Sequence, residues 1–222
     1  MSSSFRLGSD GVYRCDALQA FVWQKHGFGT RKGNPEARVT VQQIHSARVC
    51  NAAGVRHAGV QADALVTDRI RESIGVRTAD CVPILLLDVK TRAVGAIHAG
   101  WRGTAAEISA NALRKMAEDF DSEAGNIYAV LGPCIRVCCY EVDAEVAMQL
   151  ARFGAADAES ARGKQKVDLA AANRFQLQAA GVSPERIFDC ELCTRCLSEQ
   201  FYSYRRQPGD PGRMISSIAR LG

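Results

Sequence analysis

The sequence predicts a mixed fold, α+β or α/β, in which a sheet system is covered by helices. The chain has 222 residues, of which 47% are hydrophobic and 23% are charged. This balance is typical of a globular protein and excludes an intrinsically disordered one. Short apolar, β-branched runs alternate loosely with segments whose apolar residues recur at helical spacing. The length indicates one large domain or two closely joined lobes.

The first predicted strands are short. Val39–Ile44 is β-branched and partly alternating, which predicts a strand with His45 at its end. Ala62–Thr67 predicts a second strand. Val82–Val89 is apolar on both faces, as expected of a strand inside a layered fold. Because proline cannot donate a ladder hydrogen bond, Pro83 is expected at the beginning of that strand.

A strand, a glycine turn and a helix follow in the middle of the chain. Ala93–His98 predicts the strand, and the sequence Ala-Gly-Trp-Arg-Gly at residues 99–103 predicts the turn. Thr104 and Glu107 match a capping box. The apolar residues behind them recur at helical spacing as far as Phe120, which predicts an amphipathic helix.

The second half of the chain predicts two strands and two helices, followed by an irregular, arginine-rich end. The strands are expected at Ile127–Leu131 and near Ile187–Cys190, and the helices at Asp143–Phe153 and Asp168–Ala180.

Charge and hydropathy exclude several classes of protein. The net charge of +4 is too small and too scattered to indicate a nucleic-acid partner. The longest apolar stretch, Val82–Leu87, is far shorter than the ~18 residues of a membrane-spanning helix. The first residues lack the apolar segment of a secretory signal. We therefore expect a cytoplasmic protein with no membrane partner.

The chain contains nine cysteines, an odd number that argues against a disulfide scaffold and favours reduced thiols. Two groups are close in sequence: Cys134, Cys138 and Cys139, and Cys190, Cys193 and Cys196. The second group has the spacing of a metal or iron–sulfur motif, but the further cysteine followed by proline is missing. We interpret both groups mainly as packing thiols.

Four residues that can do chemistry lie where predicted strands end: His45, Asp80, Cys81 and His98. Imidazole and thiolate together suit Zn²⁺ or copper. Two histidines and one cysteine would fill three positions of a tetrahedral zinc and leave one for water or substrate, as in a catalytic site. Their spacing leaves the alternative open, because buried thiols and hydrogen-bonded histidines are common in protein interiors.

Several motifs carry a resemblance to a known family. They are Gln-Ile-His at 43–45, Ala-Asp-Ala-Leu-Val-Thr at 62–67, Thr-Ala-Asp-Cys-Val-Pro at 78–83, His-Ala-Gly-Trp-Arg-Gly at 98–103, Leu-Gly-Pro-Cys-Ile at 131–135, Cys-Tyr-Glu-Val at 139–142 and Tyr-Ser-Tyr-Arg-Arg at 202–206. The chain resembles the YfiH or laccase-domain family, also called the polyphenol oxidase or peptidoglycan-editing-factor family.

The resemblance implies a single α+β domain over residues 1–222, built as an α/β/β/α sandwich. It implies a metal triad of His45, Cys81 and His98. It also implies phosphorolysis of adenosine, inosine and methylthioadenosine, and deamination of adenosine; an older interpretation of the family involves copper and phenols. The chain departs from the family in having Ser46 where glycine is usual and a short segment between Arg31 and His45.

Our leading hypothesis is a zinc-dependent purine nucleoside enzyme in which the triad binds the metal and is catalytic. Substrate contacts are expected from Asp80, Arg102 and Arg205. The glycine turn before the predicted capped helix offers backbone N–H groups to phosphate, with Arg206 as a further contact. Each arginine could equally form a surface salt bridge, and Asp80 could cap a turn.

Three alternatives remain open. Cys81 and His98 could form the nucleophile and base of a metal-free hydrolase or amidase, for example one that edits cell-wall precursors. A copper-dependent polyphenol oxidase is the weakest alternative, because the chain has only four histidines for a multinuclear copper cluster. A non-enzymatic binding role is the third. The preferred nucleoside and the oligomeric state are not predicted.

Overall fold

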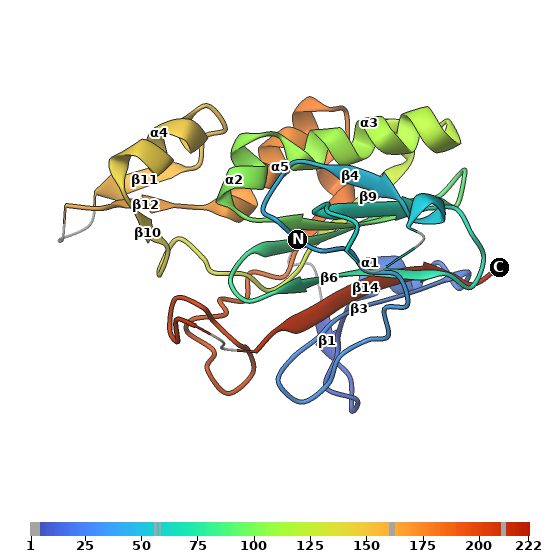
Figure 1. The fold of residues 1–222 in the computed structure, drawn as a ribbon, viewed down its shortest axis with the longest axis horizontal. Helices are drawn as coiled ribbons and strands as arrows, with labels where there is room; N and C mark the ends of the chain where they lie inside the picture. The colour runs from blue at the N-terminus through green and yellow to red at the C-terminus, as the bar shows by residue number, and fades with distance from the viewer. Residues whose placement is uncertain (1–4, 56, 58, 160–162, 210–211) are drawn as a thin grey trace.

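Two β-sheets pack face to face, and helices cover one of them (Figure 1). The computed structural model describes residues 5–55, 57, 59–159, 163–209 and 212–222. In the six-stranded sheet the order is β13 (Ile187–Asp189), β9 (Ile127–Leu131), β7 (Val82–Asp88), β8 (Val94–Ala99), β5 (Ala64–Thr67) and β4 (Val49–Asn51). In the five-stranded sheet it is β1 (Phe5–Leu7), β2 (Tyr13–Cys15), β3 (Gln24–Phe28), β14 (Met214–Arg220) and β6 (Ser73–Thr78).

The six-stranded sheet has a hydrophobic core on each face. Along β7, Ile84 and Leu86 pack under the helices, whereas Leu85 and Leu87 pack against the five-stranded sheet. Successive side chains of a strand point to opposite faces, so a strand between two layers must be apolar throughout. This arrangement explains why every residue of β7 is buried.

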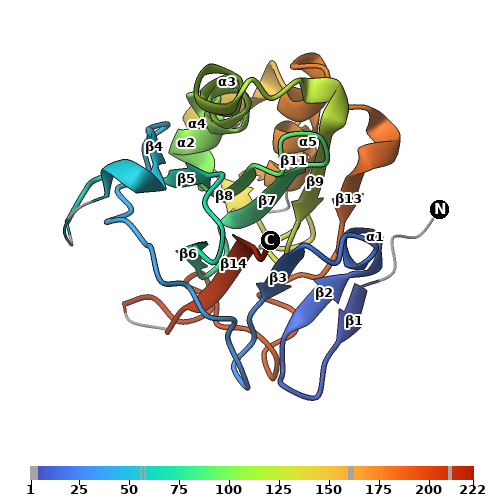
Figure 2. The same cartoon turned by 90° about the vertical axis from the view of Figure 1, so that its right-hand side faces the viewer.

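Three helices lie on the outer face of the six-stranded sheet: α2 (Trp101–Ala105), α3 (Ile108–Phe120) and α5 (Leu169–Ala179). At one end of the molecule, α4 (Ala144–Ala151) packs with a three-stranded sheet of β10 (Glu141–Val142), β12 (Gln165–Val167) and β11 (Ala156–Glu159). The one-turn α1 (Asp16–Gln19) lies beside β2 and β3 (Figure 2). Short 3₁₀ turns cover Ala52–Gly54, Ala124–Asn126 and Pro184–Arg186. The predicted α+β class is confirmed.

Three local predictions need correction. The segment predicted as a strand, Val39–Ile44, forms only isolated bridges from Val39 and Gln42, because it passes from Ile74, in β6 of the five-stranded sheet, to Gln61, just before β5 of the six-stranded sheet. The end predicted to be irregular instead contains β14. Its strand character comes from pairing with β3 on one side and β6 on the other.

The predicted capping box is also wrong. Thr104 lies inside α2, whose N-cap is Gly100. The Thr104 hydroxyl accepts a hydrogen bond from Asn173 Nδ2 at 3.0 Å and does not cap a helix. Glu107 adopts a left-handed conformation, with φ 63°, at the break between α2 and α3.

Within the described part of the chain, no helix combines the length and the apolar character needed to cross a bilayer.

Candidate metal centre and active site

The structure brings together the three residues of the predicted triad. One ligand atom each of His45, Cys81 and His98 lies within 4.8 Å of the other two. Cys81 directly precedes β7 and His98 lies near the end of β8; the two strands are neighbours, with Val82 opposite Ala99. The ring of His45 meets that of His98 edge to face, with centroids 4.8 Å apart.

A buried carboxylate holds both histidines. Asp63, which is 0% exposed, accepts hydrogen bonds from the backbone N–H groups of Ile44, His45 and Ser46 at 3.3, 2.9 and 2.6 Å. It also accepts from the Ser46 hydroxyl at 2.7 Å and from His98 Nδ1 at 2.8 Å. Asp63 therefore fixes the turn that presents His45. It also fixes the tautomer of His98.

Asp63 stays ionised despite its burial. Desolvation alone would raise its pKa, but the hydrogen bonds from His98 and Ser46 lower the pKa to about 2. An ionised carboxylate can only accept, so His98 donates its Nδ1 proton and keeps Nε2 for the cysteine side of the site. Asp63 was not among the predicted site residues, although it belongs to the motif at 62–67 and an acid at the start of a predicted strand was an available signal.

Cys81 and His98 stabilise each other's charge. Burial disfavours both charged forms, but the attraction between thiolate and imidazolium lowers the pKa of Cys81 to about 6 and raises that of His98 to about 9. The hydrogen bonds from His45 to Cys81 and from His98 to Asp63 act in the same directions. Cys81 is therefore a thiolate at neutral pH, the form required of a metal ligand or a nucleophile.

The donor set and its surroundings fit a borderline-soft metal ion. Two imidazoles and a thiolate match Zn²⁺ or copper and leave a coordination position open. Gly100 borders the site so closely that a Cβ there would lie 3.0 Å from His45 Cδ2 and 3.1 Å from Cys81 Sγ. A larger residue at this position would push against two of the three candidate ligands.

The triad lies in a pocket of about 1000 Å³, which is roomy enough for a nucleoside with an anion beside it. Its lining combines cationic and aromatic side chains, including Arg77, Arg102, Arg205, Arg213, Trp101 and Tyr140. Burial, assisted by the nearby negative charge of Cys81, raises the pKa of Tyr140, so this phenol keeps its proton at neutral pH.

Asp80 lines the pocket but is engaged by protein groups. Its carboxylate accepts from Thr194 Oγ1 at 2.6 Å, from Ser203 Oγ at 3.1 Å and from the backbone N–H of Arg205 at 2.7 Å. Its backbone is left-handed, with φ 91°. Asp80 thus anchors residues 190–209, which we term the C-terminal loop, beside Cys81.

The arginines predicted to bind substrate divide into two groups. Arg102 and Arg205 line the pocket with exposed side chains. The Arg102 guanidinium lies over the ring of Trp101, 4.3 Å from its centroid, and Arg205 Nη1 donates to the carbonyl of Glu141 at 2.6 Å. Both can therefore present N–H groups to an anion in the pocket.

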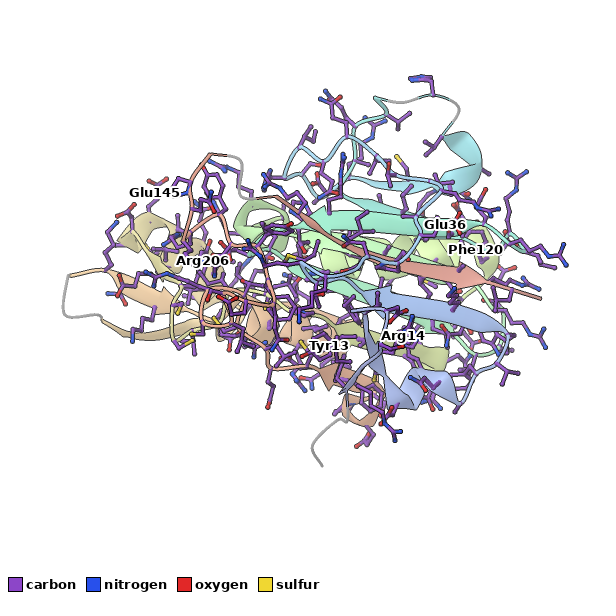
Figure 3. All side chains as sticks on the ribbon, turned by 90° about the horizontal axis from the view of Figure 1, so that it is seen from below. Tyr13, Arg14, Glu36, Phe120, Glu145 and Arg206 are labelled. Atoms are coloured by element: carbon purple, nitrogen blue, oxygen red, sulfur yellow. The ribbon has the colours of Figure 1, made fainter. Side chains whose placement is uncertain are left out.

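Arg206, by contrast, holds the backbone of the C-terminal loop. Its guanidinium donates to the carbonyls of Thr194, Arg195 and Phe201 at 2.9, 3.0 and 2.6 Å. Figure 3 shows Arg206 near the end of the molecule where α4 carries Glu145. The expected phosphate contact of Arg206 is replaced by this structural role.

Comparison with known proteins agrees with the motifs. Residues 17–221 match the model of the family described as multi-copper polyphenol oxidoreductase laccase. The chain belongs to this family.

The chain is also similar to individual proteins. It is 41% identical over 163 residues to "Adenosine deaminase RL5" from an unknown prokaryotic organism, and the alignment covers 71% of this chain and 62% of that protein. It is 37% identical over 163 residues to "Purine nucleoside phosphorylase YlmD" of Geobacillus stearothermophilus, covering 71% of the chain and 60% of the relative.

The aligned part of the chain thus spans about three fifths of the length of these two relatives. "Purine nucleoside phosphorylase YfiH" of Escherichia coli is 36% identical over 188 residues, covering 83% of the chain and 74% of the relative. The fold matches the crystal structure of the hypothetical protein YfiH of Bacillus licheniformis, with a TM-score of 0.86 and 27% identity over 97% of this chain and 98% of that one. The predicted membership of the YfiH or laccase-domain family is confirmed.

Proposed function

We propose that this protein is a zinc-dependent purine nucleoside enzyme. It catalyses phosphorolysis of adenosine, inosine and methylthioadenosine, and deamination of adenosine. The observation that carries the proposal is the convergence of His45, Cys81 and His98 within 4.8 Å in a pocket that also presents cationic and aromatic side chains. Relatives that align with most of this chain are named purine nucleoside phosphorylase and adenosine deaminase.

His45, Cys81 and His98 would hold the zinc ion. In a three-ligand site, zinc supplies Lewis acidity and lowers the pKa of a coordinated water. The remaining contributions come from the chain itself. Asp63 fixes the two histidines, and its ionised carboxylate keeps the ring of His98 in one orientation.

The pocket supplies groups suited to each part of the substrates. Arg102 and Arg205 carry the positive charge that would bind and orient phosphate. Trp101 and Tyr140 offer aromatic surface to the purine, and the protonated phenol of Tyr140 can donate a hydrogen bond. Asp80 contributes by holding the C-terminal loop, which carries Arg205, against the site.

Two reactions would share this pocket. In phosphorolysis a phosphate oxygen bonds to C1′ of the ribose as the bond from C1′ to the purine nitrogen breaks, which yields the free base and ribose 1-phosphate. In deamination water replaces the amino group at C6, and ammonia leaves. The first needs the anion-binding side chains and the second does not, so phosphate distinguishes them.

A metal-free hydrolase or amidase is the second candidate, and one observation favours it. The thiolate of Cys81 beside the imidazolium of His98 is the pair expected of a cysteine nucleophile and its base. The copper oxidase has less support. Of the four histidines, His45 and His98 alone are among the described residues that line the pocket, and His26 is buried against Cys15 and Gln24.

We place the protein in a reducing compartment, the cytoplasm, because its odd number of cysteines, nine, argues against a disulfide scaffold. Its partners would be purine nucleosides and phosphate, with no nucleic acid or membrane partner.

The test is chromatography of adenosine incubated with zinc-loaded protein, with and without phosphate, beside His98→Ala. We expect adenine that depends on phosphate, inosine that does not, and neither product from the variant. Unchanged adenosine would refute the nucleoside proposal. Activity on an amide substrate by protein freed of metal, abolished in Cys81→Ala, would instead establish the hydrolase.

A further inference from the structure

A second cluster of metal-binding side chains lies outside the triad. The two cysteine groups that are separate in sequence each contribute a pair: Cys138 and Cys139 from the segment between β9 and β10, and Cys193 and Cys196 from the C-terminal loop. All four sulfur atoms lie within 4.8 Å of one another. The sulfur of Cys196 is 3.8 Å from that of Cys138 and 3.4 Å from that of Cys139.

These separations match a tetrahedral thiolate site. With Zn–S bonds of about 2.3 Å, two sulfurs on a tetrahedral zinc are separated by about 3.8 Å. Cys193 and Cys196 also have the two-residue spacing that brings both sulfurs of a turn to one ion. The backbone N–H groups of Arg136, Arg195 and Cys196 also hydrogen-bond the sulfur of Cys193 and so fix its position.

Backbone hydrogen bonds hold the segments that carry the two cysteine pairs side by side. Cys134 forms a parallel bridge with Cys193, in which Cys134 N–H donates to the carbonyl of Leu192 at 3.2 Å and Thr194 N–H donates to the carbonyl of Cys134 at 3.0 Å. Arg136, two residues after this bridge, donates to both carboxylate oxygens of Asp189 at 2.9 Å. The thiol cluster is therefore formed on a fixed scaffold.

We propose that Cys138, Cys139, Cys193 and Cys196 bind one zinc ion in a closed, structural site. Four protein ligands leave no position for water or substrate, in contrast to the triad of two histidines and one cysteine. On binding, each thiol gives its proton to solvent, and the four thiolates with Zn²⁺ carry a net charge of −2. No oxidant is required, because all four sulfurs stay reduced.

The position of this site indicates what it stabilises. Thr194, next to Cys193, donates to Asp80, which directly precedes Cys81. Tyr140, next to Cys139, lines the pocket, as does Arg205 of the C-terminal loop. A zinc ion at the four cysteines would cross-link the segment before Tyr140 to the C-terminal loop, and both border the pocket. Cys138 and Cys196 are exposed to solvent at this position.

The test is the zinc content of full-length protein, purified without chelators, together with that of three variants. We expect two zinc ions per wild-type chain, one in the double variant Cys138→Ser/Cys196→Ser and one in His98→Ala. Cys50→Ser, which changes a cysteine outside both clusters, should keep both ions. Replacement of zinc by Co²⁺ should give stronger thiolate-to-cobalt absorption in His98→Ala than in the double variant. The site left in His98→Ala has four thiolate ligands, whereas the site left in the double variant has one, Cys81.

Wild-type content of zinc in a folded double variant would refute the site. If the double variant fails to fold, thiol alkylation of the wild-type protein decides the question. Cys138 and Cys196 should resist alkylation until a chelator is added, despite their exposure. Rapid alkylation without chelator, or a disulfide-linked peptide containing Cys139 and Cys196 in freshly prepared protein, would overturn the proposal.

Discussion

Replacement of Asp63 by asparagine tests how one carboxylate organises the triad. The native side chain accepts five hydrogen bonds, at 2.6 to 3.3 Å, from Ile44, His45, Ser46 and His98. Asparagine keeps one acceptor oxygen but turns an NH₂ group toward part of this ring of donors. Each carboxylate oxygen accepts at least two of these hydrogen bonds. Whichever oxygen is replaced by NH₂, at least two donors lose their acceptor and face another donor.

The cost can be estimated from these contacts. Hydrogen bonds to a charged group contribute about 1.5–3 kcal/mol each, so losing two lowers the free energy of unfolding by about 3 kcal/mol or more. His98 also loses the partner of its Nδ1 proton. Removal of such a support for a metal-binding histidine weakens metal binding about 10- to 100-fold.

Two assays measure the two effects separately. Urea unfolding of metal-free protein, followed by circular dichroism, gives the change in stability, and competition with a chromogenic chelator gives the zinc affinity. Asp68→Asn is the matched control, since Asp68 is exposed just beyond β5. If Asp63→Asn binds zinc as tightly as the control and unfolds at the same urea concentration, Asp63 does not organise the site.

Three further predictions follow from the same structure. Gly100→Ala should lower zinc content while leaving the circular dichroism spectrum unchanged, because the added Cβ would lie 3.1 Å from Cys81 Sγ; full zinc occupancy would contradict this. Arg205→Ala should raise the KM for phosphate at least tenfold, equivalent to about 1.4 kcal/mol, and leave deamination of adenosine intact; equal losses of both activities would show that Arg205 is not specific to phosphate. Burial lowers the pKa of His26 from its usual 6.5 to about 4, so the unfolded chain binds this proton first. The contribution of His26 to stability should therefore be nearly full at pH 7 and fall by about 2 kcal/mol between pH 7 and pH 5. His26→Gln should lack this contribution, so its unfolding in urea should differ from that of the wild type by this amount across the interval; identical pH profiles would refute this assignment.

Short sequence patterns predicted the strands whose own residues favour a strand. The strand Ile127–Leu131 matches β9 residue for residue, and Pro83 is the second residue of β7, as its missing N–H requires. The segment Met214–Arg220 was missed because its two serines, Ser216 and Ser217, suggest a loop. In the folded protein β14 lies between β3 and β6 and both serines are buried, and no local window of sequence contains this information.

The same distinction applies to the sites. The residue types at predicted strand ends, together with the motifs, identified His45, Cys81 and His98, and the structure brings them together. Asp63 was missed because a single acid beside a strand is equally typical of a turn. The four-cysteine cluster was missed for a different reason: its two pairs meet only through the bridge between Cys134 and Cys193, which the fold creates.

The place of β14 in the five-stranded sheet also affects how the protein folds. Residues 24–28 and 73–78 leave the ribosome well before Met214–Arg220, the strand that pairs with both of them. Until it arrives, β3 and β6 each have an open edge, which is the kind of surface on which nascent chains associate wrongly. Closing contacts over such sequence distances is slow. The six-stranded sheet draws its strands from residues 49–189 and can form first, so we expect this layer to be the template on which the other is completed.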